Sequence, residues 1–82
     1  MTNNIIKQVE EIINTVYLVG GAVRDIILNK QVNDYDFTTS LSPDEIEAKI
    51  REVDKRPYLV GKRFGTIGVK IDGQMIEITT FR

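Results

Sequence analysis

Residues 65–81, GTIGVKIDGQMIEITTF, predict a β-hairpin and with it the framework of the fold. Asp72-Gly73 is a type I′ turn signal between two runs of alternating apolar and polar residues. A two-residue loop sets the register, so that one face of the hairpin carries only apolar side chains: Ile67, Val69, Ile71, Ile76 and Ile78. This face is therefore the core face. On the other face Gly68 lies opposite Glu77, and the missing side chain predicts open space beside that carboxylate.

The remaining elements follow from local patterns upstream of the hairpin. Ser42, Pro43 and Glu45 predict a capped helix start, with serine as N-cap, proline at the first helical position and glutamate completing a capping box. In chain order we expect a helix over 3–14, a strand over 15–19, a helix beginning close to Gly21, a strand over 34–39, a helix over 42–53 and a strand over 57–61. Three helices and about five strands predict an α+β fold, a mixed sheet with helices mainly on one face.

Size and composition limit the chemistry. The chain has 82 residues, enough for a single domain spanning 1–82. It contains no cysteine and no histidine, which excludes thiol nucleophiles, Ser-His-Asp systems and imidazole or thiolate metal sites. No apolar run approaches the length of a membrane span, and the N-terminus lacks the pattern of a signal peptide. We expect a cytoplasmic protein with no membrane partner.

Charge is unevenly distributed along the chain. Residues 1–48 contain an excess of acidic side chains, and residues 49–70 an excess of basic ones, although the formal net charge is only −1. One interpretation is a metal site next to a surface that binds a polyanion. The other is a solvated helix and loop with chance clustering of charge.

Two aspartates stand one residue apart in DYDFTT, residues 34–39. Alternate side chains of a strand share a face, so Asp34 and Asp36 lie together, and Tyr35 and Phe37 face the core. Aspartate is a poor strand former, and adjacent carboxylates repel each other unless a cation lies between them. The pair is either a charged edge strand or a Mg²⁺ site. Glu77 favours the metal site, because its predicted face is the one that carries the aspartates, and two metal ions held there would suit phosphoryl transfer.

A second candidate site lies at the turn in YLVGGAVRD, residues 17–25, where a strand ends and a helix is expected to begin. Gly20 and Gly21 would let a phosphate approach the backbone at a helix N-terminus, and Arg24 would add a forked contact. Alternatively, the glycines serve only the backbone geometry of the turn. The sequence matches neither the P-loop nor the dinucleotide-binding pattern.

Several motifs together resemble one family. LVGGAVRD, DYDFTT, SPDEIEAKI, VGKRFGTIGV and IEITTFR are similar, in order and spacing, to the head domain of bacterial class II tRNA nucleotidyltransferases. These are the CCA-adding enzymes and their poly(A) polymerase relatives, in the DNA polymerase beta superfamily. The resemblance runs from about residue 15 to Arg82 and implies a shortened palm-like nucleotidyltransferase fold.

The resemblance also implies roles for individual residues. Asp34 and Asp36 would bind the catalytic Mg²⁺ ions, and Glu77 would be the third acidic residue. The nucleotide triphosphate, ATP or CTP, would be held by Gly20, Gly21 and Arg24. GKRFG, residues 61–65, falls where the family has a mobile loop near the active site, and Lys62 and Arg63 would meet phosphates there. The alternative for this loop is an exposed basic turn.

The resemblance departs from the family pattern beyond Arg82. The next motifs of the family and its neck, body and tail regions, which hold RNA, are not among these residues. We therefore expect a Mg²⁺-dependent core that transfers NMP to a tRNA 3′ end, incomplete without further sequence or a second chain, and with sheet edges open to self-association. Two alternatives remain, a module that binds Mg²⁺ and NTP without useful catalysis, and a minimal nucleotidyltransferase that modifies a partner protein.

Overall fold

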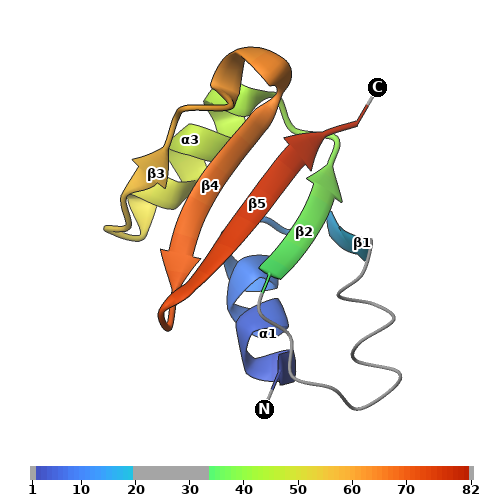
Figure 1. Cartoon of the computed structure of the whole chain (residues 1–82), viewed down its shortest axis with the longest axis vertical. Coiled ribbons are helices and arrows are strands. Elements are labelled where there is room, and N and C mark those ends of the chain that lie inside the picture. The colour runs from blue at the N-terminus through green and yellow to red at the C-terminus, as the bar shows by residue number, and fades with distance from the viewer. Residues whose placement is uncertain (1, 20–33, 82) are drawn as a thin grey trace.

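The computed structural model describes residues 2–19 and 34–81, which form a five-stranded mixed sheet with two α-helices. The described elements are α1 (Thr2–Ile12), β1 (Val16–Val19), β2 (Asp34–Thr39), α3 (Pro43–Glu52), β3 (Pro57–Tyr58), the 3₁₀ turn η1 (Lys62–Phe64), β4 (Thr66–Ile71) and β5 (Gln74–Thr80). The strand order is β1-β2-β5-β4-β3, and only β2 and β5 run parallel (Figure 1). This architecture confirms the predicted α+β class with a mixed sheet.

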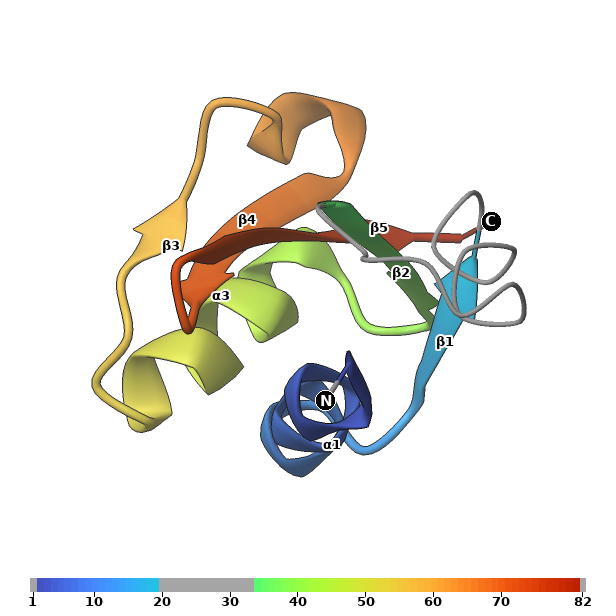
Figure 2. The ribbon, with the colours of Figure 1, turned by 60° about the horizontal axis from the view of Figure 1, so that its bottom comes forward.

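The helices lie on one face of the sheet. Figure 2 shows α1 and α3 side by side beneath the strands. Between the helices and the sheet lies one core, in which twelve apolar side chains are buried: Ile5, Val9, Ile13, Tyr35, Phe37, Ile46, Ile50, Ile67, Val69, Ile71, Ile76 and Ile78. The opposite face of the sheet is left to polar and exposed side chains, as the alternation along β2 and the hairpin predicts.

The hairpin formed by β4 and β5 has the predicted register. Ile67 pairs with Ile78, and Gly68 pairs with Glu77. Asp72 and Gly73 have positive φ angles of 51° and 78°, as both central residues of a type I′ turn must.

The start of α3 also follows the prediction. The Ser42 hydroxyl accepts from the Glu45 amide, and the Glu45 carboxylate accepts from the Ser42 amide, which together complete the capping box. The pKa of Glu45 is lowered, chiefly because its carboxylate accepts the Ser42 backbone N–H. Ile46 and Ile50 then face the core.

Two boundaries differ from expectation. The strand expected over 57–61 contains only Pro57 and Tyr58, because the chain turns directly afterwards and the Lys62 amide donates to the Leu59 carbonyl. The first helix ends at Ile12, two residues earlier than expected. The helix expected close to Gly21 lies outside the described residues. Within the described part of the chain, no helix combines the length and apolarity that a membrane span requires.

Candidate active site

Asp36 and Glu77 lie side by side on the sheet face that neither described helix covers, here called the uncovered face (Figure 2). Their Cα atoms are partners in the parallel pairing of β2 with β5, so both side chains project to the same face. Parallel neighbours are about 4.8 Å apart, which brings the two carboxylates within reach of one cation. Both residues are exposed. The geometry therefore unites two of the three predicted acidic residues.

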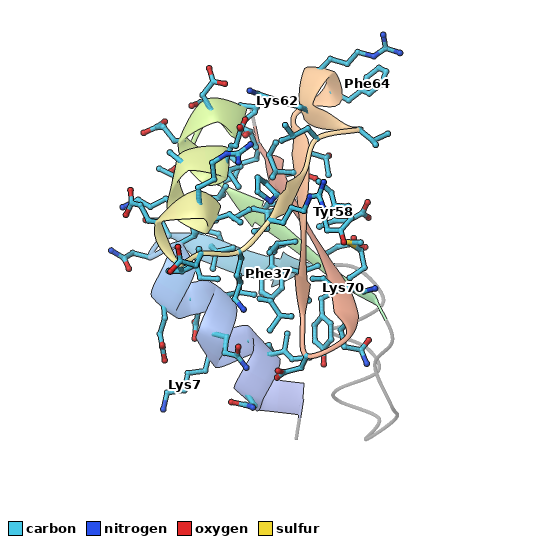
Figure 3. The ribbon with its side chains drawn as sticks, turned by 90° about the vertical axis from the view of Figure 1, so that its left-hand side faces the viewer. Lys7, Phe37, Tyr58, Lys62, Phe64 and Lys70 are labelled. Atoms are coloured by element: carbon cyan, nitrogen blue, oxygen red, sulfur yellow. The ribbon has the colours of Figure 1, made fainter. Side chains whose placement is uncertain are left out.

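The strand that carries Asp36 is anchored through its other face. Tyr35 and Phe37 are each 1% exposed, and their rings stack with centroids 6.4 Å apart. Burial raises the pKa of Tyr35. In Figure 3 Phe37 lies between the helices and the sheet. Since these two side chains are fixed in the core, the residue between them is held facing away from it.

Asp34 is the first residue of β2 and pairs with Met75 of β5. Its position in the strand places it on the same face as Asp36, two residues away. Its side chain lies outside the described residues. Among the side chains that are described, no group of three acidic residues gathers as a metal site.

Asp36 and Glu77 nevertheless suit a magnesium ion. Mg²⁺ prefers oxygen ligands and is commonly bound through one or two carboxylates, with water and substrate phosphates completing its shell. An exposed pair of adjacent carboxylates on an uncovered sheet face leaves room for those other ligands.

The predicted phosphate-binding turn follows β1 in the sequence. Gly20, Gly21 and Arg24 lie outside the described residues. The strand that precedes them is described, and Val19, its last residue, is the register partner of Asp36. The chain therefore leaves β1 at the level of the carboxylates.

Lys62 and Arg63 lie apart from the carboxylates. Lys62 Nζ is 2.7 Å from the Asp44 carboxylate and 2.8 Å from that of Glu47, so it links η1 to α3. These contacts raise the pKa of Lys62, chiefly through Asp44, and lower the pKa of Glu47, chiefly through Lys62. The Arg63 guanidinium lies 4.8 Å from the centroid of the Phe64 ring. A phosphate contact by Lys62 would require its ammonium group to leave two carboxylates.

A hollow of about 430 Å³ lies beside Glu77 on the uncovered face, and Tyr58, Val60, Phe64, Gly68 and Met75 contribute to its lining. The open space predicted beside the Glu77 carboxylate is therefore present, although Gly68 itself is closely approached by its neighbours. A Cβ atom there would lie 3.2 Å from Tyr58 Cβ and 3.4 Å from Met75 Sδ, because the short strand β3 pairs Tyr58 with Gly68. The hollow lies above Gly68, on the uncovered face. The sequence did not predict that Tyr58 lines it, because no turn signal links β3 to β4.

A larger hollow of about 490 Å³ lies near the start of α3, where Pro43, Asp44, Leu59 and Lys62 help to line it. Neither Asp36 nor Glu77 contributes to it. It is therefore not part of the carboxylate site.

Comparison with known proteins points to one family. The sequence profile of the poly A polymerase head domain matches residues 16–82. The CCA-adding enzyme of Staphylococcus saprophyticus is 38% identical over 89 residues, a match that covers all of this chain and 21% of that protein. The CCA-adding enzyme of Staphylococcus haemolyticus is 40% identical over 78 residues, covering 95% of this chain and 18% of that protein. This chain thus spans about a fifth of the length of these relatives.

Solved structures give the same result. The Bacillus stearothermophilus CCA-adding enzyme in complex with CTP superposes with a TM-score of 0.66 at 38% identity, covering 80% of this chain and 16% of that one. A tRNA nucleotidyltransferase complexed with a primer tRNA and an incoming ATP analog superposes with a TM-score of 0.71 at 32% identity. The match covers 92% of this chain and 22% of that one.

Proposed function

This chain belongs to the poly A polymerase head domain family, and we propose that it is the catalytic core of a nucleotidyltransferase. The proposed reaction transfers NMP from ATP or CTP to the 3′ hydroxyl of an RNA, with a tRNA as the acceptor. The nucleotides and the acceptor are those named for similar structures, one with CTP and one with a primer tRNA and an ATP analog. Those proteins are about five times longer than this chain. We propose that most of the RNA binding is provided by regions outside these 82 residues or by a second chain.

The pairing of Asp36 with Glu77 on the uncovered face carries the proposal. Two neighbouring carboxylates on adjacent strands repel each other, at a cost of some tenths of a kcal/mol to about 1 kcal/mol. Buried side chains on the other face of β2 and β5 offset this cost. A cation bound between the two carboxylates would offset this repulsion.

We assign the metal-binding role to Asp34 and Asp36, and the third acidic position to Glu77. Bound Mg²⁺ would neutralise charge on the phosphates and lower the pKa of the attacking hydroxyl. The chain's own contribution is to hold its carboxylates in fixed positions on a rigid sheet. Gly20, Gly21 and Arg24 are proposed to bind the triphosphate, which the pairing of the preceding residue with Asp36 supports.

The reaction forms one bond and breaks one. The RNA 3′ oxygen bonds to the α-phosphorus, and the bond from that phosphorus to the bridging oxygen breaks, so that pyrophosphate leaves with the electron pair. The proton of the attacking hydroxyl passes to water. The residues act mainly by positioning the reactants and by compensating charge.

Calorimetric titration of ATP in the presence of Mg²⁺ tests the site. We expect the double variant Asp34→Ala/Asp36→Ala to lose Mg²⁺-dependent ATP binding. Asp72→Asn is the matched control, because it removes an exposed carboxylate in the β4–β5 turn while asparagine tolerates the positive φ angle there. Equal ATP affinity in the double variant and the native chain would refute the assignment.

Labelled ATP or CTP, supplied with Mg²⁺ and tRNA, tests the transfer step. Labelled RNA supports the proposed reaction. Nucleotide binding without a labelled product indicates a binding module without useful catalysis. Label on protein instead of RNA indicates an enzyme that modifies a partner protein.

A further inference from the structure

We propose that the hollow beside Glu77 receives the terminal nucleoside of the acceptor RNA, with its base stacked against Tyr58 and Phe64. This inference rests on the proposed function and assigns a subsite to it. It concerns the described face of the sheet that faces away from the helices, where Tyr58 and Lys70 project in Figure 3.

One row of residues crosses all five strands at the level of the carboxylates. Register pairs join Val19 to Asp36, Asp36 to Glu77, Glu77 to Gly68 and Gly68 to Tyr58. Residues in such a row project to the same face. With strands about 4.8 Å apart, Tyr58 is roughly 10 Å from Glu77 along the row, measured between Cα atoms.

Gly68 creates the gap between Glu77 and Tyr58. It is buried although it lies on the uncovered face, because Tyr58 and Met75 close in around it. Any side chain at this position would rise into the hollow from its floor. A flat ring entering beside Glu77 would therefore lie over a glycine, with the Tyr58 ring at its side.

The wall of the hollow has the character of a stacking surface. Tyr58 is 41% exposed and Phe64 is 69% exposed, and both rings line the same hollow, so they form one apolar wall open to solvent. Exposed aromatic rings bind single-stranded RNA by stacking on its bases, and a nearby guanidinium adds to the attraction. The Arg63 guanidinium already lies over the Phe64 ring.

A cation for the RNA backbone lies close by. Lys70 is exposed and lies two residues from Gly68 on β4, on the same face of the sheet. Its register partner is Met75, which is also the partner of Asp34. A positive charge beside an apolar hollow complements a nucleoside joined to a phosphate.

The direction of the reaction assigns the hollow to the acceptor and not to the nucleotide. Attacking and leaving oxygens lie roughly in line on opposite sides of the phosphorus. In the proposed function the triphosphate binds where the chain leaves β1, at one end of the row. The attacking hydroxyl must then approach from the other end, over β4 and β3, where the hollow lies.

Two measurements on the native chain and its variants test the subsite. Fluorescence anisotropy reports the binding of a 5′-labelled single-stranded RNA with a free 3′ hydroxyl, and calorimetry reports the binding of ATP with Mg²⁺. We expect Tyr58→Ala to weaken RNA binding by roughly 5- to 150-fold, the loss expected for one stacked base. ATP binding should be unchanged, and Tyr58→Phe, which keeps the ring, should retain most of the RNA affinity.

Tyr17→Ala is the matched control, because Tyr17 is an exposed tyrosine on β1, well away from the hollow. RNA affinity that is the same in Tyr58→Ala and Tyr17→Ala would overturn the proposal. Weakened ATP binding with unchanged RNA binding would assign the hollow to the incoming nucleotide instead, and so would also overturn it. Failure of the native chain to bind ATP with Mg²⁺ would instead count against the proposed function.

Discussion

Replacement of Thr39 by valine tests how the sheet is held together behind the site. Thr39 is fully buried, and it is the only buried polar residue among those the structure describes. Its hydroxyl donates to the Thr15 carbonyl oxygen at 2.5 Å and accepts from the Leu41 amide at 3.3 Å. The bond to Thr15 joins the residue before β1 to the last residue of β2, and the bond from Leu41 holds the turn that follows β2. They help to set the register that brings Val19 beside Asp36.

Thr39→Val keeps the shape and the β-branching of the side chain and removes only its hydrogen bonds. Leaving a buried polar group without a partner costs about 1–3 kcal/mol. Both bonds are only partly buried, so water can reach the groups left behind, and the contact with Leu41 is long. We therefore expect a loss in the free energy of unfolding in the lower half of that range, about 1–2 kcal/mol.

Urea unfolding followed by far-UV circular dichroism measures this loss, since the chain has no tryptophan to report it. A change of 1 kcal/mol corresponds to a shift in melting temperature of about 4–8 °C for a domain of this size. Thr38→Val is the matched control, a neighbouring threonine on the uncovered face that is half-buried. The reasoning is refuted if Thr39→Val changes the free energy of unfolding no more than Thr38→Val does.

Three further predictions concern α3 and the hollow. Ser42→Ala should lower the free energy of unfolding by about 1 kcal/mol, measured by urea unfolding, because the N-cap hydrogen bond is lost. Lys62→Gln should raise the pKa of Glu47 towards its ordinary value, measured by NMR titration of the carboxyl carbons, and should leave Glu45 unchanged as the internal control. Because the pKa of Glu47 is lowered in the folded protein, its stabilising contact is present above the ordinary carboxyl pKa and is lost as the pH falls through the folded value. Gly68→Ala should weaken RNA binding in the anisotropy assay while far-UV circular dichroism stays native, and unchanged RNA affinity would contradict the position of the proposed subsite.

Local signals in the sequence predicted the elements whose partners lie nearby. The turn at Asp72 and Gly73 fixes the register of β4 with β5, because a two-residue loop leaves only one pairing that keeps the apolar residues on one face. The capping box at Ser42 is complete within four residues. Such features depend on backbone geometry close in sequence, so the sequence alone is sufficient to predict them.

Contacts between residues far apart in the sequence could not be predicted from local sequence signals. Tyr58 belongs to a two-residue edge strand, and nothing in its neighbourhood indicates that it pairs with Gly68. The open space beside Glu77 was expected, but the aromatic side chain that lines it was not. The family resemblance places Lys62 in a loop that would meet phosphates, and only the packing of η1 near α3 shows that two carboxylates already bind it. The roles of Gly20, Gly21 and Arg24 stay predictions.

The two faces of β2 explain how a small domain can hold acidic side chains together. Aspartate is disfavoured in strands, and adjacent carboxylates destabilise the sheet further. The core side chains Tyr35 and Phe37 offset this on the reverse face, where full burial of an aromatic side chain stabilises the fold by about 1.5–3 kcal/mol each. Their packing also fixes which face of β2 carries Asp36. In the proposed function a bound cation would offset the repulsion between the carboxylates without movement of the backbone.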